Sequence, residues 1–244
     1  YAQAIGIGTN ALDALTTGDY NIGIGPNAGG ALTTGHTNIA IGRTSLSTMT
    51  LGSTNVAIGE QALTTSQNSD KNIAIGSVAM GAADVSGDEN VAIGSEAVTN
   101  ITTGASNVGI GTTALGGLTT GKRNVGIGVG TAGSNALIGD NNVLLGYHAG
   151  KSATRTSGSV YIGHNAGQNH TMGYANVAIG SGSMGLANQT FGGENIAIGS
   201  YTLEDTTEGT FNIAVGFRAA DELTTGDYNI ALGHLAMSAG TTTG

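Results

Sequence analysis

The sequence predicts an all-β fold, a parallel β-solenoid built from one short repeat. Three observations predict it: a motif that recurs about every 17 residues, 44 glycines among 244 residues, and a single proline. Glycine at this frequency is incompatible with a helical bundle, because each one costs about 1 kcal/mol relative to Ala in a helix interior. Collagen needs abundant proline, and a disordered chain carries many more charges than the 9 % found here.

The repeat is anchored by the pentapeptide Asn-(Ile/Val)-small-aliphatic-Gly, as in residues 38–42 and 55–59. Fourteen copies follow one another, most of them 17 residues apart, and Ala4 and Ser159 replace the Asn in two copies. The Asn of the other twelve copies stands at Asn21, Asn38, Asn55, Asn72, Asn90, Asn107, Asn124, Asn142, Asn176, Asn195, Asn212 and Asn229. Because the period holds throughout, we expect residues 1–244 to form one domain, a single array of about fourteen coils.

Each pentapeptide is expected to form a short strand. Its second and fourth residues are Ile, Val or Leu, so alternation places both on one face. The residue between them is Ala or Gly in twelve copies, which indicates close packing on the other face as well. We therefore expect small residues such as Ala57 and Ala74 to face another chain. Leu144 and Tyr161 are the two large exceptions. They predict locally altered packing near residues 140–165, with the contact between chains widened or the roll offset.

The second half of the repeat reads Ala-Leu-x-x-Leu-Thr-Thr-Gly, most clearly in residues 114–121. The pentapeptide ends in Gly in all fourteen copies, which predicts a positive φ or no room for a Cβ at that position. A second Gly closes the repeat in most copies, three residues before the next Asn. Two short strands and two glycine corners are therefore expected in each coil, with coils stacked about 4.8 Å apart.

The twelve asparagines are expected to form a structural ladder rather than a ligand site. An Asn at a corner can bond nearby backbone, and stacked Asn side chains can bond one another between coils.

A coil of 17 residues encloses little core, so burial against further copies of the chain is expected. Three chains close symmetrically, and a homotrimer is the predicted assembly.

The Asn-(Ile/Val)-Ala-Ile-Gly-x-x-Ala units resemble the head repeats of YadA-like trimeric autotransporter adhesins. The longer units with Leu-Thr-Thr-Gly, and residues 139–150, resemble repeats of bacteriophage tail fibres more closely. This resemblance implies a left-handed parallel β-roll, three chains to a fibre, and a role in attachment. The 17-residue period exceeds that of the adhesin heads, and the stalk heptads and membrane-anchor strands of that family are not found here. We expect a tail-fibre segment on a virion, with a bacterial adhesin head at the extracellular cell surface as the alternative.

The charge pattern bears on the partners of the chain. The formal net charge is −9, and Lys122 with Arg123 is the one adjacent basic pair, so nucleic acid is not an expected partner. No apolar run approaches the roughly 20 residues that span a bilayer, so no membrane insertion is expected.

The motifs of cofactor and metal sites are weak in this sequence. Gly-x-Gly-x-x-Gly occurs at 128–133 and 180–185, as chance predicts at this glycine content, and neither string opens a helix. We expect no cofactor. His148, His164 and His170 follow glycine corners, where we expect surface side chains and no metal site.

Enzyme and ice-binding activities are two competing interpretations. Paired acidic residues occur at 88–89, 204–205 and 221–222, but no catalytic set recurs at matched register, so no catalytic residues are expected. Flat threonine ladders on solenoids can bind ice, and Thr-Thr pairs recur here. Neighbouring threonines point to opposite faces, however, and the series is broken between residues 121 and 205.

The aromatic residues are distributed unevenly along the chain. Eight of the ten Tyr and Phe residues lie at or after Tyr147. Exposed rings on a rigid scaffold commonly stack on sugars or bury a partner surface. We therefore predict ligand-binding residues at Tyr147, His148, Tyr201 and Phe217, with a cell-surface glycan or another host receptor as the partner. The alternative is that these rings pack at a seam between chains or against other fibre segments.

Overall fold

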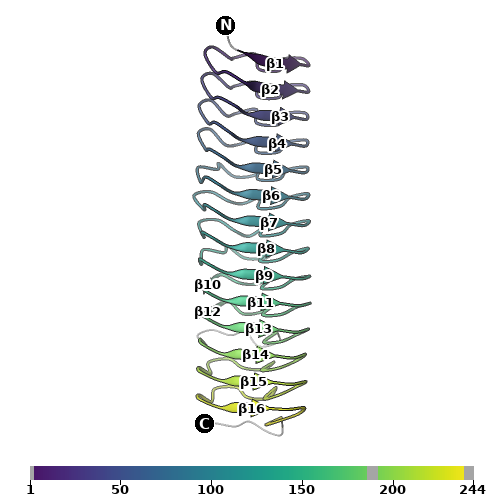
Figure 1. Cartoon of the computed structure of the whole chain (residues 1–244), viewed down its shortest axis with the longest axis vertical. Helices are drawn as coiled ribbons and strands as arrows, with labels where there is room; N and C mark the ends of the chain where they lie inside the picture. The colour runs from purple at the N-terminus through teal and green to yellow at the C-terminus, as the bar shows by residue number, and fades with distance from the viewer. Residues whose placement is uncertain (1–2, 186–191, 239–244) are drawn as a thin grey trace. The chain divides into compact units, whose positions relative to one another are not determined.

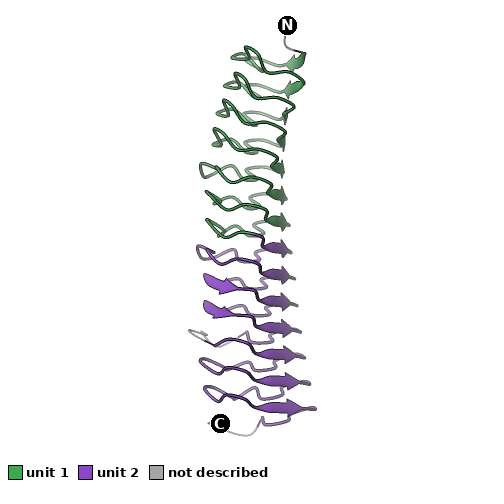
Figure 2. Cartoon of the chain, turned by 60° about the vertical axis from the view of Figure 1, so that its left-hand side comes forward, with its two compact units in different colours: residues 1–122 green, residues 123–244 purple. Residues whose placement is uncertain are grey.

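The pentapeptides pair side by side in parallel, as the sequence predicts for a β-solenoid. A computed structural model describes residues 3–185 and 192–238, and these residues contain strands and turns but no helix (Figure 1). The chain divides into two units, residues 1–122 and residues 123–244 (Figure 2). The prediction of a single domain stays a prediction, as do the handedness and the trimer.

The first unit contains seven short strands, one from each coil. They are β1 (Ala4–Ile7), β2 (Asn21–Ile24), β3 (Ile39–Ile41), β4 (Val56–Ile58), β5 (Ile73–Ile75), β6 (Val91–Ile93) and β7 (Val108–Ile110). Each strand pairs in parallel with the next along the chain, and equivalent repeat positions are partners, as in Ala57 with Ala74. Repeat positions therefore form columns along the stack.

The second unit continues the same pattern with seven ladder strands. They are β8 (Val125–Ile127), β9 (Val143–Leu145), β11 (Val160–Ile162), β13 (Val177–Ile179), β14 (Ile196–Ile198), β15 (Ile213–Val215) and β16 (Ile230–Leu232). A separate two-stranded parallel sheet joins β10 (Arg155–Ser157) and β12 (Met172–Tyr174) in two consecutive coils.

The small middle residue of each strand lies inside its own coil. Ala57 and Ala74 are fully buried, whereas the flanking Val56 and Ile58 point outward and are half-buried. The expectation that the Ala column faces another chain is therefore wrong. The middle position is crowded inside the coil, because a Cβ on Gly23, which holds this position in β2, would already lie 2.8 Å from the Leu12 side chain. The small residue therefore turns inward, and the branched residues are left outside.

The expected second strand is also wrong for most coils. In the second half of the repeat, residues alternate into left-handed backbone, with φ of 53° at Leu46 and 47° at Leu63. Left-handed backbone costs an ordinary residue roughly 1–2 kcal/mol, and it ends any strand. Burial of these leucines and hydrogen bonds between coils offset that cost: Leu46 N–H donates to the Ala62 carbonyl (3.0 Å), and Leu63 N–H to the Ala79 carbonyl (2.9 Å).

The glycine that ends the pentapeptide is required twice over, as predicted. Its φ is +135° at Gly59, a conformation that side chains rarely adopt. A Cβ there would lie 2.5 Å from the Gly76 carbonyl oxygen of the next coil, so the coils could not stack at this spacing.

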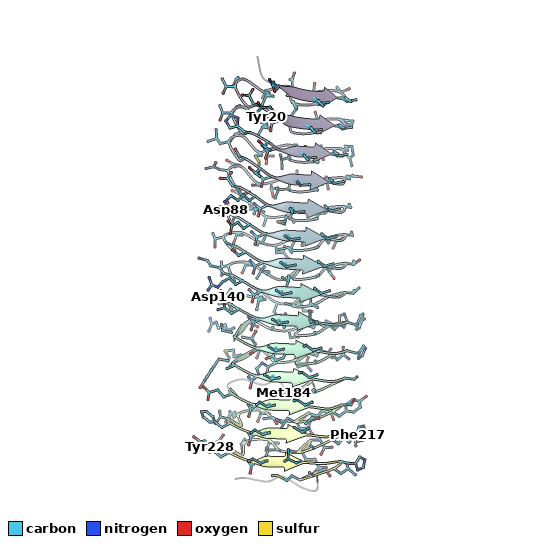
Figure 3. All side chains as sticks on the ribbon, viewed as in Figure 1. Tyr20, Asp88, Asp140, Met184, Phe217 and Tyr228 are labelled. Atoms are coloured by element: carbon cyan, nitrogen blue, oxygen red, sulfur yellow. The ribbon has the colours of Figure 1, made fainter. Side chains whose placement is uncertain are left out.

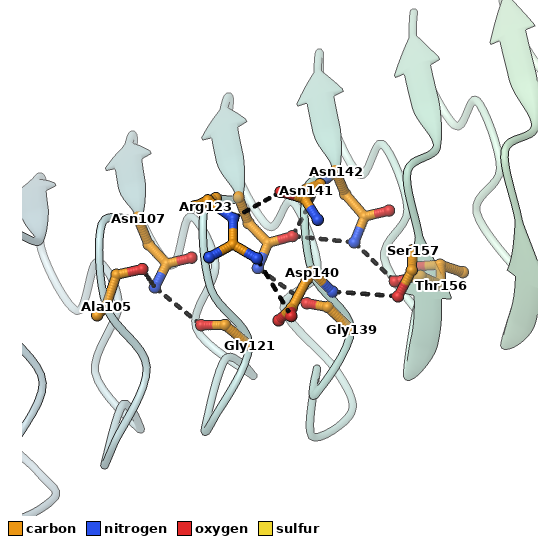
Figure 4. A network of polar contacts seen from close by, with 11 residues as sticks. Ala105, Asn107, Gly121, Arg123, Gly139, Asp140, Asn141, Asn142, Thr156 and Ser157 are labelled. Carbon is orange, nitrogen blue, oxygen red and sulfur yellow. Dashed lines mark hydrogen bonds and ion pairs between the residues drawn. The ribbon is translucent and has the colours of Figure 1, made fainter.

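The asparagines form a buried ladder inside each unit. The Nδ2 of Asn38 donates to the Gly52 carbonyl (2.8 Å), which closes its own coil. Its Oδ1 accepts two hydrogen bonds from the next coil, from the backbone N–H (3.0 Å) and the Nδ2 (3.1 Å) of Asn55. In the second unit Asn142 donates in the same way to Asn124 and to the Thr156 carbonyl (Figure 4).

The ladder changes at Ser159, where a buried polar cluster takes over. Ser159 N–H still donates to Asn142 Oδ1 (3.0 Å). Tyr161 is fully buried beside it, and its hydroxyl is hydrogen-bonded to Nδ1 of His170, whose Nε2 lies 3.3 Å from Asn176 Nδ2. Burial raises the pKa of Tyr161. The expectation of a surface His170 is wrong, because its ring fills the interior with Tyr161 where the Asn side chain is absent.

The large side chains of Leu144 and Tyr161 occupy interior space that a glycine in the same coil leaves free. Both large side chains are fully buried, and their strands keep the register of their neighbours, so the expected offset of the roll is wrong. The residue opposite each one is Gly150 or Gly167, at a repeat position where most other coils carry Leu, Met or Val. A Cβ on Gly150 would lie 2.9 Å from Leu144 Cδ2, and one on Gly167 would lie 2.6 Å from Tyr161 Cδ2.

We predict that removing one rung of the ladder destabilises the fold. Asn72→Ala leaves the Gly87 carbonyl and both donors of Asn90 without their partner, and should lower the free energy of unfolding by about 3 kcal/mol. Chemical denaturation followed by circular dichroism measures this change. Asn68→Ala, at an exposed turn, is the matched control, and an equal effect of the two substitutions would contradict the ladder's role.

A double-mutant cycle tests whether the side chains at positions 144 and 150 share one space. Leu144→Ala should cost about 3 kcal/mol through the cavity it leaves, and Gly150→Leu should cost about 2 kcal/mol through overpacking. The double variant has the residue types that the β4 coil carries at these two repeat positions, Ala57 and Leu63, and should be more stable than Gly150→Leu alone, because the nearest contact of the new side chain, Leu144 Cδ2, is gone. Strictly additive losses in the same denaturation assay would show that the two positions do not share one space.

Candidate functional site at one edge of the sheet

The predicted binding residues lie at the edge where the strands end. Parallel strands align their carboxyl ends, so the two residues after each pentapeptide stack in two columns along that edge. We call this edge, in the second unit, the ring edge: residues 147–148, 164–165, 181–182, 200–201, 217–218 and 234–235. Phe217 marks it in Figure 3. The second residue of each pair is in left-handed backbone wherever it is not glycine, as in Tyr201 (φ 57°), which turns the chain back at this edge.

Tyr147, His148 and His164 form the first ring cluster. The Tyr147 and His164 rings are stacked, with centroids 5.3 Å apart and planes 10° apart, and Tyr147 is 48 % exposed. The His148 ring lies over Gly130, where a Cβ would come within 2.6 Å of its Cδ2. Burial, and then the charges of Lys151 and His164, lower the pKa of His148. These effects favour the neutral form of the His148 imidazole.

Tyr201, Phe217 and His234 form the second ring cluster. Phe217 stacks on His234 with centroids 5.5 Å apart and planes 12° apart, and it meets Tyr201 edge-on at 6.2 Å. Tyr201 is 38 % exposed and Phe217 is 45 % exposed. The guanidinium carbon of Arg218 lies 5.7 Å from the Tyr201 ring centroid and 5.9 Å from that of Phe217. Arg218 and Tyr201 hold the same repeat position, the second residue after the pentapeptide, in neighbouring coils. This position places the cation beside both rings.

Acidic side chains surround the second cluster. The Arg218 Nε lies 3.9 Å from Asp221 Oδ2. Burial and the neighbouring Asp205 raise the pKa of Glu204, and Arg218 opposes that rise. The cation is thus held by its own neighbours, and the cluster does not form a positively charged patch.

The opposite edge of the sheet carries a ring pair that the sequence interpretation missed. Phe211 and Tyr228 stack with centroids 5.0 Å apart and planes 1° apart, and Tyr228 is 74 % exposed. Their equal repeat position, one residue before the Asn, is the signal that could have revealed the pair. Tyr20 holds the same position in the first unit (Figure 3).

Polar side chains at this opposite edge serve the scaffold. Ser53 N–H donates to the Asp70 carboxylate (2.7 Å), and Asp70 N–H donates to Asp88 (2.8 Å). In the second unit Asp140 N–H donates to the Ser157 hydroxyl (3.2 Å), and the Asp140 carboxylate lies 3.7 Å from Arg123 (Figure 4). These carboxylates link one coil to the next.

The described residues contain neither a membrane-spanning helix nor a metal-binding group of side chains. No helix within residues 3–185 and 192–238 is long and apolar enough to span a membrane. In the same part of the chain, no three His, Cys, Asp or Glu side chains are grouped so that they could hold a metal ion.

Removing the exposed rings should separate binding from stability. Replacing Tyr147, Tyr201 and Phe217 together by Ala should leave the thermal transition nearly unchanged, because exposed positions contribute little to folding. The same variant should lose binding to glycan-bearing host cells, the partner that the sequence predicts. Tyr20→Ala with Tyr228→Ala, at the opposite edge, is the control that should keep binding. A fall in melting temperature with the three rings, or intact binding without them, would assign them to the scaffold.

No protein-family model matches the sequence, and no curated protein matches it significantly.

Proposed function

We propose that this chain is a segment of a bacteriophage tail fibre, that it assembles as a homotrimer of parallel copies, and that it serves attachment to a host. The observation that carries the proposal is an apolar face along each unit that the chain itself does not cover. The resemblance of the longer repeats to tail-fibre repeats supports the phage assignment and the number of copies.

The apolar face is made by the outward residues of the ladder strands. Each of the seven strands in the first unit, and each of the seven in the second, turns two aliphatic side chains outward, and none of these is fully buried. Ile58 and its column neighbour Ile75 are typical. Monomeric soluble proteins rarely expose apolar patches larger than a few hundred Å². A face that repeats in every coil therefore favours a partner along its whole length.

Further copies of the same chain match this face best. Its side chains recur with the spacing of the coils, so a parallel copy presents the same spacing and can pack against every coil in register. Burial of apolar surface stabilises such an assembly by roughly 25 cal/mol per Å². A cyclic arrangement of copies keeps all chains parallel and closes without leaving an open face. A fibre made in this way presents each edge several times, and multivalency raises its avidity for a surface.

The threonine hydroxyls argue against the ice-binding alternative. Thr16 Oγ1 donates to the Thr33 carbonyl (2.9 Å), Thr33 Oγ1 to the Thr50 carbonyl (2.9 Å), and Thr102 Oγ1 to the Thr119 carbonyl (3.1 Å). These hydroxyls link neighbouring coils and are not arrayed for ordered water. A bacterial adhesin head would share the same architecture, and identifying the particle or cell that carries the chain distinguishes the two.

The assembly is tested by mass in solution. The wild-type chain should give three times its monomer mass by light scattering. Ile58→Asp with Ile75→Asp should dissociate it, because carboxylates would be buried between copies. Gln67→Asp, at an exposed turn, should leave the mass unchanged. A stable, monodisperse wild-type monomer would end the trimer proposal, and labelling of particles with an antibody against the chain tests its place in the tail.

A further inference from the structure

We propose that the ring edge contains a binding slot for a neutral oligosaccharide that lies along the stack of coils. The slot is bounded by His164 and Phe217, and its floor carries Ser181 and Ser200. We call it the serine slot. The inference rests on the proposed attachment function and names the class of ligand and the residues that would contact it.

The boundaries of the serine slot come from one column of the ring edge. The first residue after the pentapeptide is Tyr147, His164, Ser181, Ser200, Phe217 and His234 in six consecutive coils, from β9 to β16. The first two rings stack on each other, and so do the last two, with nearly parallel planes in both pairs. The rings of each pair therefore face along the column, towards the two serines between the pairs.

The dimensions suit a short saccharide. His164 and Phe217 are three coils apart, about 14 Å at the spacing of neighbouring strands. A pyranose ring is about as long as one coil spacing, so the slot admits a segment of about two sugar units. A terminal unit contacts His164 or Phe217 when it turns its apolar face across the column, parallel to that ring. Apolar sugar faces stack on aromatic rings in the same offset manner as other ring contacts.

The floor of the serine slot offers hydroxyl groups without partners. Ser181 and Ser200 are partly exposed, and neither side chain makes a hydrogen bond within the part of the chain that the structure describes. Tyr201 stands beside them with its ring over Gly182, where a Cβ would lie 2.8 Å from the ring. Beside His164, the buried side-chain oxygen of Asn165 also accepts no hydrogen bond from the described residues. Ring faces combined with a few hydroxyls are typical of sugar recognition.

The surrounding charge favours a neutral ligand. Arg218, the cation beside Phe217, is already engaged by two rings and by Asp221. Glu204 and Asp205 follow Tyr201, and the whole chain carries a net charge of −9. A sialylated or sulfated sugar would meet repulsion here, so neutral hexoses or N-acetylhexosamines are the expected units.

Filling the serine slot is the direct test. Ser181→Tyr and Ser200→Phe place rings at a repeat position that already carries Tyr147 and Phe217, so the fold accommodates them. Ser77→Tyr and Ser95→Phe make the same changes at the same repeat position in the first unit, as matched controls. The probes are neutral di- to tetrasaccharides of glucose, galactose, mannose and N-acetylglucosamine. Saturation-transfer NMR and calorimetry on the assembled full chain measure their binding.

The wild type should bind at least one of these sugars, and either slot-filling substitution should weaken that binding at least tenfold. The controls should bind like the wild type, and His164→Ala or Phe217→Ala should weaken binding several-fold. Absence of wild-type binding across the panel, unchanged binding in the filled variants, or tighter binding of sialyl-lactose than of lactose would overturn the slot.

Mass measurements on the same samples separate this inference from the proposed function. If Ser200→Phe changes the mass of the assembly and Ser95→Phe does not, the edge is a seam between copies and the sugar slot is wrong. A wild-type monomer that binds sugar would instead keep the slot and overturn the trimer.

Discussion

The buried asparagine ladder is the interaction on which the rest of this structure depends. Each rung donates to the closing carbonyl of its own coil and accepts two hydrogen bonds from the next, as Asn38 does with Gly52 and Asn55. A buried amide left unpaired costs roughly 1–3 kcal/mol, so the ladder holds neighbouring coils at one spacing and one register. The glycine corners follow from that spacing, because a Cβ on Gly59 would collide with the next coil.

Constant register turns every repeat position into a column, and each column has its own physical task. The inner columns share a narrow space, so bulk on one wall requires a small residue on the other. A Cβ on Gly23 would lie 2.8 Å from the Leu12 side chain, and one on Gly150 would lie 2.9 Å from Leu144 Cδ2. The outer columns are free of this limit, and branched residues such as Ile58 stand there partly exposed. The residue types at the two edges of the sheet are restricted least, because side chains there contact only the coils directly before and after them.

The period, the glycine corners and the stacked coils could all be predicted from the sequence, because each is a repeated local requirement. Which face of each strand points into the coil could not be predicted, since alternation defines two faces but does not indicate which one is inside. The small Ala57 suggested close packing against a partner, and the structure shows the crowded interior of the coil instead. The prediction of a second strand was wrong because leucines with left-handed backbone, such as Leu46, are rare, and no sequence pattern indicates them. His170 was predictable in principle, since Ser159 and Tyr161 depart from the repeat in the same coil.

The edges explain why the candidate site could be placed from the sequence only in outline. Residues there tend to match the residue one coil away: Arg43 pairs with Glu60, Asn10 donates to Asn27, and ring stacks on ring in both clusters. The exposed aromatic residues thus obey the same rule as the ion pairs, and exposure of a ring alone does not imply a ligand. What departs from the rule is the run of two serines between the stacked ring pairs, where neither side chain contacts its neighbour through a hydrogen bond among the described residues. A side chain that makes no hydrogen bond to a neighbouring coil is the one that can take a contact from outside. For this reason our proposal places ligand binding at the gap between the rings and not on the rings alone.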